Sequence, residues 1–162
     1  MTREEAVDRV LACAAKYLGM REQPKGSNKG EILIFGGKGG PWCAAFVNFV
    51  YHEATGQDPT SAGFCRGTLR MLAAAKRDGL VRPKGEPPQR GDIFVLSRGP
   101  GHGHTGFVES VTCDSHGPRM QTIEGNSGNQ VARRTRFTTA RVLGFIRPGA
   151  APAAEGGEGW ET

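Results

Sequence analysis

The hydrophobic pattern of this chain changes its period near Asp92, and this change limits the possible folds more than any other feature. Before Asp92, apolar residues such as Val7, Val10 and Leu11 recur at the spacing of one helix face. After Asp92, short runs rich in valine, isoleucine and phenylalanine alternate with glycine, asparagine and aspartate, as in strands and turns. Helices followed by a run of strands predict an α+β fold.

Cap and turn residues set the expected limits of the elements. Thr2 is placed to cap the first helix, and Gly19 suggests where that helix ends. Proline suits the first turn of a helix, so the second helix is expected to begin at Pro41 or Trp42. The expected helices span residues 2–20, 41–54 and 66–78, and the expected strands span residues 93–96, 104–111, 120–123, 131–136 and 142–146.

The length of the chain, 162 residues, supports one domain with a single core, which we expect at residues 1–148. Residues 149–162 are mostly alanine, proline, glycine and glutamate, a composition that predicts a disordered tail. The first residues form an amphipathic pattern instead of an apolar signal core, and no stretch is long enough to span a bilayer. We therefore expect synthesis in the cytoplasm without a signal peptide.

The net charge of +5 and the pI of about 9.3 favour an anionic partner. Nucleic acid, an acidic cell-wall polymer and an anionic membrane all satisfy this condition, so the sign of the charge alone does not choose among them. The four cysteines show no tight pairing pattern, and without an export signal we expect free thiols. They are Cys13, Cys43, Cys65 and Cys113.

Cys43 differs from the other three cysteines in its surroundings. It follows a glycine-rich loop and stands in the first turn of the expected second helix. The unpaired N–H groups at a helix N-terminus lower the pKa of a thiol, and the thiolate is the nucleophilic form. Cys43 is therefore a candidate nucleophile, although most intracellular cysteines are only small apolar helix residues.

A candidate base and its partner follow Cys43 in the chain. His104 stands where a glycine-rich loop enters an expected strand, and His102 is an equal candidate on position alone. Glu124 ends the next expected strand and would lie beside His104 if the two strands form a hairpin. A carboxylate there can fix the tautomer of the imidazole and stabilise its charged form. Asn126 can do part of this work, and a simple turn is the competing interpretation of residues 124–126.

Four segments in this order resemble the CHAP family, whose name stands for cysteine, histidine-dependent amidohydrolase/peptidase. They are Pro-Trp-Cys-Ala-Ala-Phe-Val at residues 41–47, Gly-Asp-Ile-Phe-Val-Leu at 91–96, His-Thr-Gly-Phe-Val at 104–108 and Thr-Ile-Glu-Gly-Asn at 122–126. The resemblance covers residues 26–148, nearly the whole chain outside the expected tail. It implies a papain-like fold, in which N-terminal helices pack on an antiparallel sheet of about five to six strands.

The resemblance also implies an activity and a set of site residues. The implied reaction is cleavage of amide bonds in bacterial peptidoglycan, either between muramic acid and the stem peptide or within the peptides. By position, Cys43 matches the nucleophile, His104 the base and Glu124 the orienting residue, and Asn126 is a fourth catalytic candidate. Trp42 and His102 are candidates for substrate binding, and core packing is an equal alternative for Trp42.

No cofactor or metal is expected. Some relatives bind calcium just before the nucleophile, but here Glu31 is the one carboxylate between residues 26 and 42, too few for a calcium site. Zinc is a weak alternative that would draw on Cys113, His116, His102 and His104.

Two other functions compete with the hydrolase. A nucleic-acid-binding module would use the arginines near the C-terminal strands, although no aromatic residues interleave with them. These arginines are Arg133, Arg134, Arg136, Arg141 and Arg147. A cysteine peptidase or effector acting on proteins would use the same catalytic residues. We expect a monomer that binds peptidoglycan, binds no nucleic acid and does not insert into a membrane. It would reach the wall after release during phage lysis, or by delivery as an effector.

Overall fold

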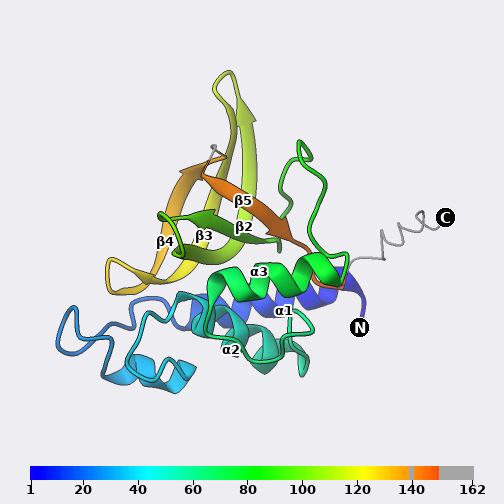
Figure 1. Cartoon of the computed structure of the whole chain (residues 1–162). Coiled ribbons are helices and arrows are strands. Elements are labelled where there is room, and N and C mark those ends of the chain that lie inside the picture. Colours follow the sequence, from blue (N-terminus) through cyan, green and yellow to red (C-terminus); the bar gives the residue numbers. More distant parts are fainter. Residues whose placement is uncertain (139–140, 150–162) are drawn as a thin grey trace.

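The computed structural model describes residues 1–138 and 141–149. Within them, helices precede strands along the chain, as the change of hydrophobic period predicts (Figure 1). The helical elements are α1 (Arg3–Lys16), the short 3₁₀ helix η1 (Glu31–Phe35), α2 (Cys43–Thr55) and α3 (Thr68–Arg77). The strands are β1 (Ile93–Ser97), β2 (Gly103–Asp114), β3 (Gly117–Ser127), β4 (Gln130–Phe137) and β5 (Val142–Ile146).

Helix α1 begins where its cap residue predicts and ends earlier than expected. The Thr2 hydroxyl accepts a hydrogen bond from the Glu5 N–H at 3.0 Å, and the Glu5 carboxylate accepts one from the Thr2 N–H, which completes a capping box. The helix was expected to reach residue 20, but it ends at Lys16. The reason is a non-local pairing, because the backbone of residues 19 and 20 bonds with Val131 of β4.

The five strands form one antiparallel sheet in the order β4-β3-β2-β1-β5. Strands β2 and β3 form a long hairpin closed by Ser115 and His116, and this hairpin extends beyond the rest of the sheet (Figure 1). Side chains alternate between the two faces of the sheet. Ile93 and Val95 of β1 join the main core under the helices, whereas Phe94 and Leu96 join a smaller cluster on the opposite face.

Strands β2 and β3 separate at one end, and this separation positions the site. Strand β2 pairs with β1 from Gly103 onward, but its ladder with β3 starts only at Phe107. Residues 103–106 of β2 therefore lack a strand partner on the β3 side. Helix α2 approaches closely here, since a Cβ built on Gly125 would stand 2.5 Å from the Cβ of Phe46. Only glycine allows β3 to pass so close to this helix.

The predicted tail falls almost entirely on residues 150–162, which lie outside the described residues. Among the described residues, no helix is both long enough and apolar enough to cross a membrane. All four cysteines are free thiols, as the sequence predicts.

A buried ion pair fastens the β1–β5 edge of the sheet. Asp92 precedes β1 and is fully buried, and Arg147 follows β5 with its side chain 8% exposed. Two hydrogen bonds of 2.8 and 3.0 Å join the guanidinium to the carboxylate. The Asp92 carboxylate also accepts the N–H of Gln89 at 2.8 Å. The Arg147 guanidinium also donates to Glu86 at 2.9 Å, so loss of Asp92 would leave this buried charge with the partly exposed Glu86 as its remaining acceptor among the described residues.

The Asp92→Ala substitution is expected to lower the free energy of unfolding by about 3 kcal/mol, because it removes two of the three hydrogen bonds that neutralise the buried Arg147 charge. Urea denaturation of the purified protein measures this loss. Asp8→Ala is the matched control, since Asp8 pairs with Arg90 on the exposed surface and should contribute less than about 1 kcal/mol. Equal losses for the two variants would contradict the role given to the buried pair.

Candidate active site

Cys43 is the first residue of α2, as predicted, and its side chain is only 6% exposed. The residue before it, Trp42, occupies the N-cap, and no side chain accepts a hydrogen bond from the N–H groups of the first turn. This contrasts with α1, which has a complete capping box. The N–H groups beside the Cys43 thiol are therefore free of a side-chain acceptor, and the positive end of the helix dipole lies at the sulfur.

The Trp42 side chain lies in the core. It is fully buried, its ring stacks on Phe35 with 5.8 Å between centroids, and its indole N–H donates to Glu22 at 2.8 Å. The predicted contact of Trp42 with substrate is therefore corrected to the alternative, core packing. The partner, Glu22, comes from a loop twenty residues earlier and is itself 2% exposed.

His104 lies on the unpaired stretch of β2 and is 3% exposed. Its Nε2 lies 2.8 Å from Oε1 of Glu124, which leaves Nδ1 as the ring nitrogen available to the thiol. Cys43 and His104 lie close enough to shift each other's pKa, so that the pKa of the thiol falls and that of the imidazole rises. Burial alone would lower the pKa of the imidazole, but its interactions with Cys43 and Glu124 outweigh this effect and raise the pKa above its usual value.

Glu124 is fully buried and has four hydrogen-bond donors. His104 approaches Oε1, the Thr122 hydroxyl donates to Oε2 at 2.5 Å, and Arg136 donates to both oxygens at 2.5 and 2.7 Å. Burial would raise the pKa of this carboxyl. Arg136, His104 and Thr122 reverse the shift and hold the pKa at about 2, so Glu124 is an anion that faces the imidazole.

The same balance acts on the thiol. Burial raises the pKa of Cys43, but the hydrogen bond and charge of His104, the Thr68 hydroxyl at 3.5 Å and the backbone of Thr105 together lower it below its usual value. The pKa of Cys13 changes in the opposite direction, to about 12, because that thiol is partly buried beside the Glu53 carboxylate. The first environment favours the thiolate form of Cys43, and the second favours the neutral thiol of Cys13.

The two remaining candidates form no hydrogen bond with this group in the part of the chain that the structure describes. His102 is exposed and lies in the turn before β2, where its backbone bonds with Arg98 and Gly99. Asn126 is half-buried, has a φ of 57° and stands at the irregular end of β3. No hydrogen bond within the described residues joins Asn126 to His104 or Glu124. The geometry thus brings together Cys43, His104 and Glu124, and it is Glu124, not Asn126, that bonds the His104 ring.

The sequence matches the CHAP domain over residues 19–126, more than half of the chain. The chain belongs to the CHAP family. No curated protein sequence matches it. The matched range contains Cys43, His104 and Glu124, the three residues that the fold assembles here.

Solved structures share the papain-like CHAP fold at low sequence identity. Ly7917 aligns with a TM-score of 0.54 and 16% identity, over 91% of this chain and 63% of its own. The endolysin LysIME-EF1 aligns at 0.58 and 17%, over 91% and 66%. The peptidoglycan hydrolase RipB from Mycobacterium tuberculosis aligns at 0.51 and 19%, over 90% and 65%. This chain therefore spans slightly less than two thirds of each of these structures.

The sequence analysis assigned no role in this candidate site to three residues that contribute to it, namely Thr68, Thr122 and Arg136. Thr122 stands two positions before Glu124, so strand alternation places both on one face and was a usable signal. Arg136 gave no such signal, because the strand register sets it opposite Met120 and not opposite Glu124. Thr68 comes from the start of α3, and only the folded chain brings it to Cys43.

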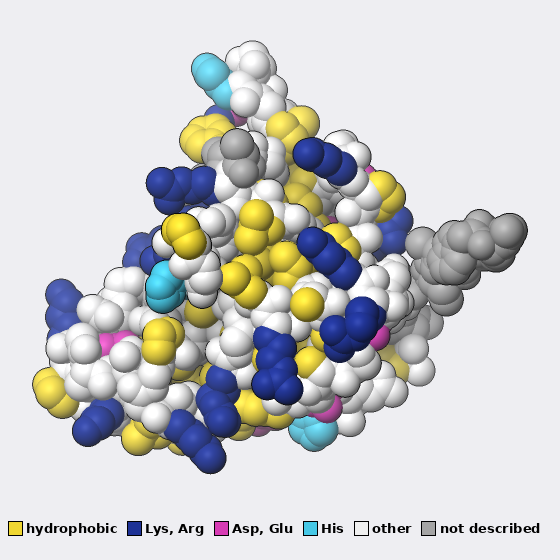
Figure 2. Space-filling view, in the orientation of Figure 1, with side chains coloured by type: hydrophobic (Ala, Val, Ile, Leu, Met, Phe, Trp, Pro, Cys, Tyr) yellow, Lys and Arg dark blue, Asp and Glu magenta, His cyan; other side chains and the backbone are white. Residues whose placement is uncertain are grey.

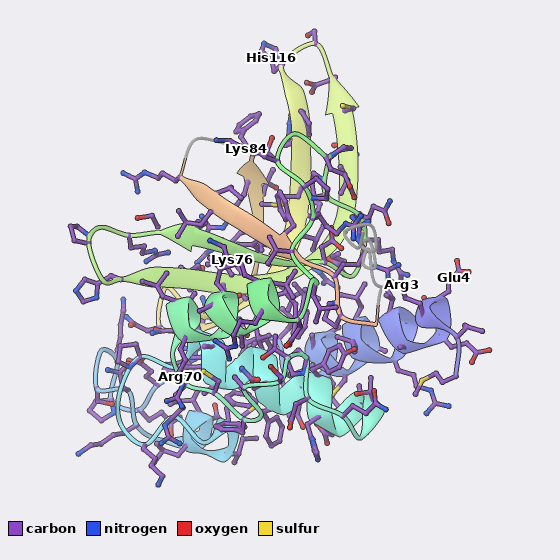
Figure 3. The ribbon with its side chains drawn as sticks, turned by 45° about the vertical axis from the view of Figure 1, so that its right-hand side comes forward. Arg3, Glu4, Arg70, Lys76, Lys84 and His116 are labelled. Carbon is purple, nitrogen blue, oxygen red and sulfur yellow. The ribbon has the colours of Figure 1, made fainter. Side chains whose placement is uncertain are left out.

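The donors proposed for zinc are dispersed. Cys113 lies nine residues beyond His104 on β2, which corresponds to about 30 Å along a strand. His116 is at the tip of the hairpin, which projects away from the helices (Figure 3). Among the residues that the structure describes, no group of three or more His, Cys, Asp or Glu side chains is placed to hold a metal ion.

Alkylation of Cys43 by iodoacetamide is expected to begin at lower pH than that of an ordinary thiol, because its lowered pKa keeps the thiolate present there. Peptide mass spectrometry across about pH 5 to pH 9 follows each cysteine separately. In His104→Ala, burial still raises the pKa of Cys43, but His104 no longer lowers it. Alkylation of Cys43 should therefore begin at higher pH than in the native chain. Cys13 should stay unreacted throughout, and an unchanged Cys43 profile in His104→Ala would refute the coupling of the two residues.

Arg136→Gln is expected to raise the pKa of Glu124, because burial then acts against fewer compensating bonds. As pH falls through that raised pKa, Glu124 becomes neutral and His104 loses its anionic partner. The alkylation rate of Cys43 at about pH 5 should then fall by about tenfold relative to the native chain, and by less at neutral pH. Arg136→Lys keeps the charge and should recover part of the rate, whereas equal losses for both variants at all pH values would indicate a purely structural role.

Proposed function

We propose that this CHAP protein hydrolyses amide bonds of bacterial peptidoglycan through an acyl-enzyme on Cys43. The bond cut is either the one between muramic acid and L-alanine or one within the stem peptides and cross-bridges. The main observation in support is the buried relay of Cys43, His104 and Glu124, in which the thiol has a lowered pKa and the base an ionised partner. An activated thiol beside a base that a third group orients is the arrangement that acyl transfer by a cysteine uses.

The observed arrangement supports each step of this proposed reaction. The Cys43 thiolate attacks the amide carbon, and N–H groups at the start of α2 are placed to stabilise the oxyanion, since no side chain caps them. His104 delivers the proton that it took from the thiol to the leaving amine, and the C–N bond breaks. A water molecule then loses a proton to His104 and attacks the thioester, which releases the acid and regenerates the thiol.

Several observations support peptidoglycan as the substrate. The chain belongs to the CHAP family, and two of the solved structures with its fold are described as an endolysin and a peptidoglycan hydrolase. A further structure contains Ly7917 with "the hydrolyzing product of MDP". The positive charge of this chain also suits an anionic wall. Release during phage lysis, or delivery as an effector, remains a prediction.

A protein substrate is the alternative, because a peptidase would use the same three residues. The nucleic-acid alternative has less support, because several of the arginines on which it depends bond to other residues of the protein. Arg133 pairs with Glu109, Arg134 bonds Ser127, and Arg147 pairs with Asp92. Arg136 is likewise bonded to Glu124.

Purified sacculi of several wall types, incubated with the protein, are expected to release fragments with new amine termini that mass spectrometry can identify. Cys43→Ala should reduce the rate by at least about a thousandfold, because it removes the nucleophile. Cys113→Ala is the matched control, since this exposed cysteine lies on the hairpin away from the site and its loss should leave the rate unchanged.

The products separate the possible outcomes. Stem peptides that begin with alanine would establish an amidase, and cut cross-links an endopeptidase. Equal rates for Cys43→Ala and the native chain would overturn the mechanism. A folded native protein that cleaves no wall but cleaves a protein would establish the alternative.

A further inference from the structure

A groove of about 550 Å³ lies on the face of the sheet turned away from the helices. It runs between the end of β1, the end of β4 and the start of β5. Its lining residues are Leu96, Arg98, Thr135, Arg136, Phe137, Arg141 and Val142. Figure 2 shows a hydrophobic area on this view of the molecule, with Lys and Arg side chains around it.

The lining combines positive charge with an apolar wall. Three of the seven described lining residues are arginines and none is acidic. Leu96, Phe137 and Val142 supply the apolar part, and Phe137 is 50% exposed, an unusual position for so large a hydrophobic side chain. A groove of this kind suits a ligand with an anionic group on a partly apolar chain.

Arg136 connects this groove to the catalytic residues. Its Nε and one N–H of Nη2 bond the Glu124 carboxylate. A guanidinium has five N–H donors, so three remain, and none of them has an acceptor among the described residues. The side chain is 25% exposed although its partner Glu124 is fully buried. One edge of the guanidinium therefore faces the catalytic carboxylate, and the rest of it lines the groove.

The groove also adjoins the strand that carries the base. Arg98 belongs to the turn between β1 and β2, where its N–H bonds the carbonyl of His102 at 2.9 Å. His104 stands opposite Leu96 in the β1–β2 ladder, so both side chains lie on the face that bears the groove. A substrate that crosses His104 can extend into the groove without leaving this face of the sheet.

We propose that this groove is a subsite for a carboxylate-bearing peptide segment of the substrate, with Arg98 and the outer edge of Arg136 as the residues that pair with the carboxylate. Arginine fits a planar carboxylate through two parallel N–H bonds, and the apolar wall can hold the neighbouring aliphatic part of the peptide. This proposal rests on the proposed function, because the groove would bind the part of a wall peptide that lies next to the cleaved bond. Peptides whose carboxylates are amidated would then be poorer ligands.

The test measures binding to the full-length Cys43→Ala protein, which cannot turn the ligand over. Isothermal titration calorimetry compares a synthetic stem peptide with free carboxylates and the same peptide with its carboxylates amidated. We expect the free acid to bind about tenfold more tightly, and Arg98→Gln to remove most of this difference. Arg9→Gln is the matched control, because Arg9 is an exposed arginine on α1 and its loss lowers the net charge equally.

Equal affinity for the two peptides, no measurable binding of the free acid, or an equal loss in Arg98→Gln and Arg9→Gln would each overturn the subsite. The proposed function is tested separately by digestion of sacculi. If the native chain cleaves sacculi and Arg98→Gln does so with an unchanged KM, the subsite fails and the function stands. If the carboxylate peptide binds through Arg98 but no wall is cleaved, the function fails and the groove remains an acidic-peptide site.

Discussion

The candidate catalytic group depends on a carboxylate, Glu124, that stays ionised although it is fully buried. A buried Glu124 without compensation would take up a proton and cease to attract the imidazole. Arg136, Thr122 and His104 prevent this by donating four hydrogen bonds to its two oxygens. The ionised carboxylate then raises the proton affinity of His104, and His104 in turn lowers the pKa of Cys43. Glu124 thus shifts the pKa of His104, and His104 shifts the pKa of Cys43.

Backbone geometry brings the series to the thiol. Helix α2 covers one face of the sheet, whereas the side chains of His104 and Glu124 lie on the other face. The two can meet only because β2 and β3 separate before Phe107, which opens the sheet beside residues 103–106. Gly125 allows β3 to pass against α2 at this opening, since any side chain there would collide with Phe46. The pairing pattern of the sheet is therefore part of the site.

Local patterns in the sequence predict the elements and the nucleophile, because caps, turns and hydrophobic spacing act over a few residues. They place Cys43 at the start of α2 and join the strands of His104 and Glu124 in a hairpin. They cannot choose between His102 and His104, which depends on β2 starting at Gly103. The choice of Glu124 over Asn126 depends on an irregularity in the β3–β4 ladder. The core position of Trp42 and the reach of Arg136 depend on partners twenty and twelve residues away in the chain.

Trp42 has a consequence for how far this scaffold can be stabilised. A serine or aspartate at a helix N-cap typically stabilises a protein by about 1 kcal/mol, and α2 forgoes this because its N-cap side chain is a core residue. Such a cap would also place an oxygen on the N–H groups that adjoin the Cys43 sulfur, and a carboxylate would oppose the thiolate directly. Selection for thermal stability and selection for a reactive thiol therefore act in opposite directions at this one position. A heat-resistant version of the protein has to gain its stability at the other end of α2 or in another element.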